Sequence, residues 1–266
     1  MALATVFAQF VGFVLVAIWL IKVKLPFPFA KKDIRADAGS TGYIFKVGLP
    51  LVLQDLVISI SFMIIMGLVN RIGDGVTASA SVAVVSRIFS LGTIVPMSVG
   101  AAIAAITAQN LGAGKPERAR KAMKWGIIYS AAFNLAFVLV CQFFAAGVTG
   151  LFSNDRSVID GAANYLHGFV LDSLMVAFVF CFNAYLSGIG KSTIVMYHSL
   201  LGTFGLRVPL SIIICAQAGL TVNATLFRLG FASPIASIVP MIICVWYITW
   251  YNRKHRGDFQ ALGDAQ

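Results

Sequence analysis

The chain has 266 residues, of which 59% are hydrophobic and 11% are charged, and its mean hydropathy is +0.89. A soluble domain carries about 25% charged residues, so this composition excludes a water-soluble globular protein and indicates that lipid is the main solvent. The net charge of +10 would suggest nucleic-acid binding in a soluble protein, but the position of the basic residues along the chain points to a membrane face instead.

Long apolar segments recur along the chain, each close to the about 20 residues that a membrane-spanning helix needs. They are rich in Ala and Leu and lack the two-residue alternation of barrel strands. Helices also satisfy every backbone hydrogen bond internally, as lipid requires. We therefore predict an all-α membrane protein with about seven transmembrane helices, at residues 2–21, 43–69, 77–106, 125–151, 162–187, 192–216 and 229–251.

The predicted helices group into four regions: a leading helix at 1–22, a cytoplasmic linker at 23–42, a six-helix lobe at 43–251 and a cytoplasmic tail at 252–266. Within the lobe, each set of three helices begins with a helix that carries an Asp in mid-membrane. The next helix carries an Arg and a proline. This pattern indicates an internal three-helix repeat of the kind found in transporters.

Lysine and arginine are distributed unevenly between the connections. The connections on one side hold most of them, at residues 22, 24, 31, 32, 35, 46, 115, 118, 120, 121, 124, 191, 253, 254 and 256. The connections on the other side hold only Arg71 and Arg156. The positive-inside rule therefore predicts a multi-pass protein of the cell (inner) membrane, with its C-terminus in the cytoplasm and its N-terminus outside.

Ionisable residues inside the predicted spans are candidate functional residues, because each costs about 2.5–3.5 kcal/mol to insert. The deepest are Asp55, Arg87, Asp172 and Arg207. At 1.5 Å per residue, Asp55 and Arg87 lie roughly 22 and 16 Å from the outer helix ends, and Asp172 and Arg207 both lie roughly 15–17 Å deep. These depths permit two ion pairs, Asp55–Arg87 and Asp172–Arg207.

Two interpretations of these charges stay open. The pairs could be structural, lowering the insertion cost and fixing helix register. Alternatively, a carboxylate in a low dielectric binds and releases a proton or Na+ as access alternates. Asp172 is the stronger candidate for this coupling site, since Asn183 lies three turns along the same helix face. Asp55 is the second, with Gln54 and Ser59 as polar neighbours.

Pro96 lies well inside the predicted span 77–106. A proline removes one backbone hydrogen bond and bends a helix. We predict Pro96 as a hinge, with a static kink as the alternative.

Two glycine–lysine segments, GAGKP at 112–116 and GIGKS at 188–192, look like parts of a phosphate-binding loop. A Walker A loop requires G-x-x-x-x-G-K-[ST]. Gln109 and Pro116 break the first copy and Tyr185 breaks the second. We predict no nucleotide or nucleic-acid binding and interpret both segments as cytoplasmic turns.

The remaining chemistry is sparse. The four cysteines and three histidines show no metal-ligand spacing, so we predict no cofactor and no metal, apart from a coupling Na+ at Asp172. No nucleophile–base constellation appears, so an enzyme is not expected.

Several segments resemble the C-terminal half of a MATE (multidrug and toxic compound extrusion) transporter. They are VGLPLVLQDLVISISFMIIMGLVNRIG at 47–73, AAITAQNLGAGKPERARKAM at 104–123, FCFNAYLSGIGKSTIVM at 180–196 and LRVPLS at 206–211. The resemblance runs through residues 43–251. The leading run 2–21 resembles the last helix of that family's N-terminal lobe.

The resemblance implies one lobe of a two-lobed antiporter that exports organic cations and other amphiphiles in exchange for Na+ or H+. In one branch of the family, acids on the first and fourth helices of this lobe form the cation site. Asp172 matches the acid of the fourth helix. Asp55 lies one turn before the first-helix acid, whose place Ile58 takes here. In another branch the coupling acid lies in the N-terminal lobe.

We therefore expect a cation-coupled efflux antiporter of organic cations and drugs, present here as a partial chain. Its expected partners are the bilayer, an amphiphilic or cationic small molecule, and a missing N-terminal lobe or partner chain; a homodimer of lobes is an alternative. Two other functions stay open: a lipid or oligosaccharide-lipid flippase of similar fold, and a non-transporting membrane subunit.

Overall fold

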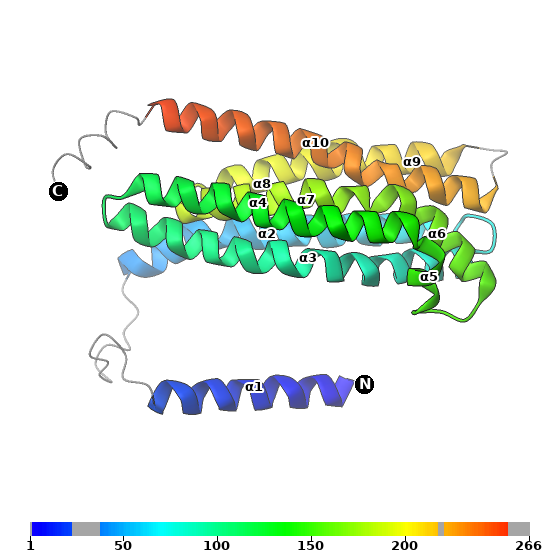
Figure 1. The fold of residues 1–266 in the computed structure, drawn as a ribbon, viewed down its shortest axis with the longest axis horizontal. Helices are drawn as coiled ribbons and strands as arrows, with labels where there is room; N and C mark the ends of the chain where they lie inside the picture. Colours follow the sequence, from blue (N-terminus) through cyan, green and yellow to red (C-terminus); the bar gives the residue numbers. More distant parts are fainter. Residues whose placement is uncertain (1, 23–37, 218–220, 255–266) are drawn as a thin grey trace. The chain divides into compact units, whose positions relative to one another are not determined.

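The computed structural model describes residues 2–22, 38–217 and 221–254 (Figure 1). The predicted linker and tail lie largely outside these residues. The chain divides into two units, Met1–Tyr43 and Ile44–Gln266. The first unit contains helix α1, Ala2–Lys22, whose apolar part is Val6–Leu20. The second unit contains the later helices, apart from the first residues of the helix that begins at Ala38.

The second unit is a bundle of long helices. In chain order they are α2 (Ala38–Val69, which begins in the first unit), α3 (Gly75–Gly112), α4 (Pro116–Phe143), α5 (Ala145–Gly150), α6 (Arg156–Phe169), α7 (Leu171–Gly188), α8 (Ser192–Leu200), the π-helical segment η2 (Leu201–Arg207), α9 (Val208–Ala216) and α10 (Val222–Lys254). Within the described residues, six helices are long and apolar enough to cross a membrane: Thr41–Val69, Gly75–Gly112, Pro116–Phe143, Leu171–Gly188, Ser192–Ala216 and Val222–Tyr251.

The predicted helix positions are correct, but several predicted ends are wrong. The predicted run 125–151 is α4 from Pro116 to Phe143 followed by the short α5, and the run 162–187 is two helices that meet at Val170. The helices continue past the apolar stretch into charged sequence, as in the first turns of α4. Hydropathy therefore locates the membrane-embedded part of each helix and not its ends.

The core has two apolar clusters, toward opposite ends of the bundle. One contains Val82 and Val85 of α3, Leu166 of α6 and Leu226 of α10, and the other contains Tyr185 of α7. α3 packs along α4, α6 and α7, and α10 packs against α6 and α7. Helix α2 differs, because most of its residues between 44 and 64 are exposed. These clusters hold the helices that position the site described below.

Two short turns, between α3 and α4 and between α7 and α8, have the same hydrogen bonds. In the first, the N–H of Lys115 donates to the carbonyl of Asn110 (2.7 Å) and that of Gly114 to Leu111 (3.1 Å). The second repeats this pattern from Lys191 and Gly190, with distances of 2.8 and 2.9 Å. Both are Schellman helix ends, which favour glycine in the left-handed region. Gly114 and Gly190 have φ of 69° and 75°.

Replacing Gly114 or Gly190 by Ala is expected to lower the free energy of unfolding by about 1–2 kcal/mol, because an L side chain is strained at positive φ. The midpoint of thermal unfolding in detergent measures this. Gly112→Ala is the matched control, since a Cβ there meets nothing within 4 Å. Equal midpoints for the three variants would contradict the prediction.

Candidate functional site

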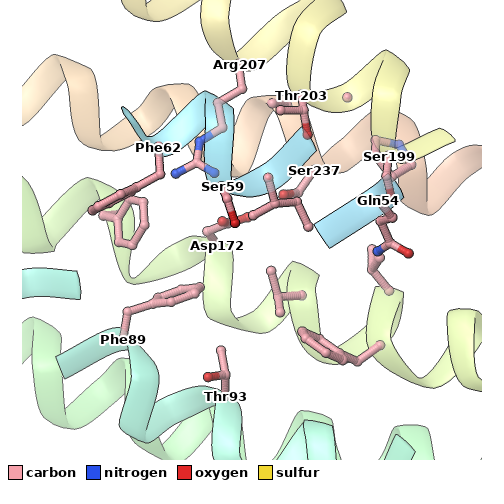
Figure 2. Close-up of a pocket in the computed structure, with 18 of the residues that line it drawn as sticks. Gln54, Ser59, Phe62, Phe89, Thr93, Asp172, Ser199, Thr203, Arg207 and Ser237 are labelled. Carbon is pink, nitrogen blue, oxygen red and sulfur yellow. The ribbon is translucent and has the colours of Figure 1, made fainter. Parts of the chain in front are cut away.

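A cavity of about 670 Å³ lies among α2, α3, α7, the α8–η2 segment and α10. Its size is within the range of small-molecule sites. Phenylalanines from four helices line it, at positions 62, 89, 169 and 180. Hydroxyls such as Ser59 and Thr203 border the same cavity, as Figure 2 shows together with Phe62 and Phe89. The cavity is therefore mainly apolar, with polar groups at a few positions.

Asp172 is the carboxylate of this cavity. It is 6% exposed and lies in the first turn of α7, just after the interruption at Val170. The hydroxyl of Ser237, on α10, donates a 2.5 Å hydrogen bond to its Oδ1. A buried carboxylate with one such donor is short of partners, because an ionised carboxylate can accept about four hydrogen bonds.

Arg207 points into the same cavity from the end of η2 (Figure 2). Its Cζ lies 5.9 Å from the ring centroid of Phe169, within the range of a cation–π contact. Its Nε is buried and has no hydrogen-bond partner among the described residues.

The predicted ion pair between Asp172 and Arg207 is not formed. Within the described residues, the ion pair with a separation below 4.0 Å is that of Glu117 and Arg120, both on α4. Asp172 and Arg207 have similar depths and line the same cavity. The Asp172 carboxylate, however, accepts its hydrogen bond from Ser237, and the Arg207 guanidinium lies near Phe169. The two charges therefore line one space without touching.

The π-helical segment η2 has a local cause. The N–H of Val208 donates to the carbonyl of Thr203, five residues earlier. The next residue, Pro209, has no N–H, and in a regular α-helix its ring crowds the carbonyl four residues before it. A wider turn relieves this contact, and π-helical turns are frequent at functional sites. η2 brings Gly202, Thr203 and Arg207 to the cavity wall.

The second predicted pair, Asp55–Arg87, is also not formed. Asp55 is exposed and lies one turn before Ile58 and Ser59, which line the cavity. Arg87 is exposed and borders a separate small hollow beside Phe152, away from the cavity-facing side of α3. Depth estimates fix the position of a residue along a helix but not its direction around it, which explains the error.

Pro96 and Asn183, the other residues singled out in the sequence, differ in their relation to the cavity. Pro96 is buried inside α3, one turn after the cavity-lining Thr93, and is not itself a lining residue; its role as a hinge stays a prediction. Asn183 lines the cavity together with Asp172. Its Oδ1 lies 2.9 Å from Nε2 of His198, which is buried at 1% exposure. Because an amide oxygen only accepts, this pairing places the hydrogen on Nε2.

The sequence does not indicate which of the 21 phenylalanines, or which small hydroxyl residues, line the cavity. Ser237 lies in the segment GFASPIAS, whose small residues indicate close helix packing. Ser and Thr are common in spanning helices, where they bond to their own backbone, as Ser59 does to the carbonyl of Asp55 at 2.9 Å. No signal in the sequence separates Ser237 and Thr203 from such residues. In the part of the chain that the structure describes, no group of three or more His, Cys, Asp or Glu could hold a metal.

Comparison with known proteins identifies one family. The MatE family model matches residues 50–213. The chain is 20% identical over 256 residues to the probable multidrug resistance protein YoeA of Bacillus subtilis (strain 168), covering 95% of this chain and 54% of that protein. It is 27% identical over 165 residues to the FAD transporter of Shewanella oneidensis, covering 62% and 36%. The chain thus spans about half or less of the length of these relatives.

Solved structures agree. A crystal structure of a MATE protein in complex with MaL6 matches with a TM-score of 0.80 and 21% identity, covering 98% of this chain and 56% of that one. An outward-facing multidrug resistance MATE transporter matches with a TM-score of 0.79 and 20% identity, over 98% and 56%. At these identities the likeness shows the fold.

Proposed function

The chain belongs to the MatE family, and on that premise we propose that it is one lobe of a cation-coupled efflux antiporter for organic cations and other amphiphilic drugs. Members of this family are transporters and not enzymes, and the six spanning helices make this a multi-pass membrane protein. The relatives named as multidrug resistance proteins support a drug-like substrate.

The observation that carries the proposal is the buried carboxylate of Asp172 in a cavity lined by phenylalanines. A proton or Na+ neutralises this charge in a low dielectric, and an organic cation does the same when the coupling ion has left. Competition for one carboxylate exchanges the two cations. The Ser237 hydroxyl, 2.5 Å from Asp172, supplies a second oxygen for Na+, and no cofactor is needed beyond the coupling ion.

The proposal includes a second lobe or partner chain beside α2. This helix exposes Asp55 together with apolar side chains such as Leu56 and Met63, which are 52% and 72% exposed. A carboxylate facing lipid costs about 2.5–3.5 kcal/mol, so a watery cleft or another protein surface is the favoured neighbour. The relatives, about twice as long, support a second lobe.

We propose the inner membrane with the C-terminus in the cytoplasm. The turns before Lys115 and Lys191 and the end of α10, with Arg253 and Lys254, lie at the same end of the bundle (Figure 1). One end therefore collects the basic connections, and the positive-inside rule places this end in the cytoplasm.

Export by cells that lack their own efflux pumps tests the proposal. The chain is expressed with the coding sequence directly upstream, or together with a separate N-terminal MATE lobe. Export of a fluorescent organic cation is measured under an imposed Na+ or pH gradient. Export that requires both lobes and one gradient is expected. No export with both lobes folded contradicts the proposal and favours a non-transporting subunit, and movement of a lipid-linked substrate favours a flippase.

A further inference from the structure

Arg207 is a fixed positive charge in the cavity whose hydrogen-bonding groups are unused. Its guanidinium has no hydrogen bond and no ion pair within 4.0 Å among the described residues. Its Cζ lies 5.9 Å from the centre of the Phe169 ring, and a cation–π contact of this kind uses none of the N–H donors. A guanidinium stays charged in proteins, and its fork of N–H donors matches a carboxylate or phosphate.

The surroundings of Arg207 complete an anion-binding subsite. Thr203 lies one turn earlier in η2 and Ser199 lies at the end of α8, and both side chains border the cavity (Figure 2). No hydrogen bond from either hydroxyl is formed within the described part of the chain, so both remain free to donate. The carboxylate of the cavity, Asp172, is held by Ser237 instead of by the guanidinium.

We infer that Arg207, with Thr203 and Ser199, binds an anionic oxygen group, carboxylate or phosphate, of an aromatic amphiphile that the cavity accepts. This deepens the proposed function, on which it rests, by naming a substrate class. The separated charges favour a zwitterion, with its cationic part at Asp172 and its anionic part at Arg207. Phenylalanines of the same cavity, such as Phe62 and Phe89, would contact the aromatic body.

The charge balance of the cavity gives the same result. With Asp172 ionised, the two charges cancel, so a zwitterion adds no net charge, whereas a simple cation leaves Arg207 without a counter-charge. With Asp172 neutralised by the coupling ion, Arg207 alone remains, and the cationic part of the substrate loses its partner. An anionic group on the substrate thus serves as the counter-ion that the protein does not provide.

Two dyes that differ in one group test the inference by equilibrium binding. Rhodamine B carries a carboxylate and a delocalised cation, and its ethyl ester keeps the cation only. Affinity is measured by fluorescence anisotropy with the purified chain in a non-ionic detergent, without a gradient. Arg207→Gln is expected to weaken rhodamine B binding by roughly tenfold, which corresponds to the loss of one charge-assisted hydrogen bond. The affinity for the ester should stay the same or increase. Arg207→Lys is expected to restore part of the difference.

Arg87→Gln is the matched control, because Arg87 borders the other hollow, and it should change neither dye. Equal weakening of both dyes by Arg207→Gln would overturn the inference, as would no dye binding to the unmodified chain. Normal dye selectivity with no export would instead count only against the proposed function.

Added phosphatidylglycerol separates the two sources of anion. Competition with rhodamine B that disappears in Arg207→Gln would mean that a lipid phosphate occupies the subsite, and would overturn its assignment to a transported substrate.

Discussion

Asp172→Asn is expected to reduce gradient-driven drug export by roughly tenfold or more, because the amide keeps the size of the side chain but neither binds a proton nor balances Na+. The Ser237 hydroxyl can still donate to the amide oxygen, so the fold is expected to persist. The measurement is export by the two-lobed protein under the gradient that drives the parent. Thermal unfolding of the same samples checks folding.

Asp160→Asn is the matched control, because Asp160 is an exposed acid on α6 and should leave export unchanged. Ser237→Ala should have a smaller effect than Asp172→Asn, since it removes one donor and leaves the carboxylate. Full export by Asp172→Asn would assign Asp172 a structural role and place coupling in the proposed second lobe.

Gly168→Ala and Gly230→Ala are each expected to lower the free energy of unfolding by about 1–3 kcal/mol or more, because there is no room for a methyl group where α6 crosses α10. A Cβ on Gly168 would lie 2.8 Å from the carbonyl carbon of Gly230, and one on Gly230 would lie 2.5 Å from the carbonyl oxygen of Tyr165. Backbone atoms cannot move aside as a flexible side chain does. Unfolding in a denaturing detergent and the monodisperse fraction measure the loss.

Gly67→Ala is the control for this crossing. Gly67 lies inside α2, and a Cβ there meets nothing within 4 Å. Ala is favoured over Gly in a helix by about 1 kcal/mol, so this variant should be neutral or more stable. The double variant of Gly168 and Gly230 should cost less than the sum of the two, since both methyl groups push the same helices apart. Strict additivity would argue against a shared contact.

The sequence predicts the helices well because composition and length alone decide what can cross a bilayer. The sequence also singles out Asp172 and Arg207, which line one cavity in the structure, because an ionisable group at that depth is costly to insert. The direction of a side chain around its helix could not be predicted. This is why the predicted ion pair between Asp55 and Arg87 is wrong. Each has a depth that suits a pair, but both side chains are exposed and form no ion pair, because direction depends on which helices become neighbours.

Ser237 illustrates a different limit. Its role depends on the distance of α10 from α7, two helices that are far apart in the sequence.

The amphipathic start of α6 was missed for another reason. Asp155 caps that helix by accepting from the N–H and hydroxyl of Ser157, and the same bonds hold the pKa of Asp155 below its usual range. The polar sequence that follows is too hydrophilic to stand out in a hydropathy plot.

The π-helical turn of η2 determines the direction of Arg207 and, through it, the net charge of the cavity. Converting the π-helical turn between Leu201 and Arg207 to α-helical spacing would rotate the residues at its end by the equivalent of one residue, about 100° around the axis. Arg207 stands at the end of η2, so its guanidinium would rotate out of the cavity, while Ser199, before the wide turn, would stay. The π-helical turn in the middle of a spanning helix thus determines whether the cavity contains both charges or the Asp172 carboxylate alone.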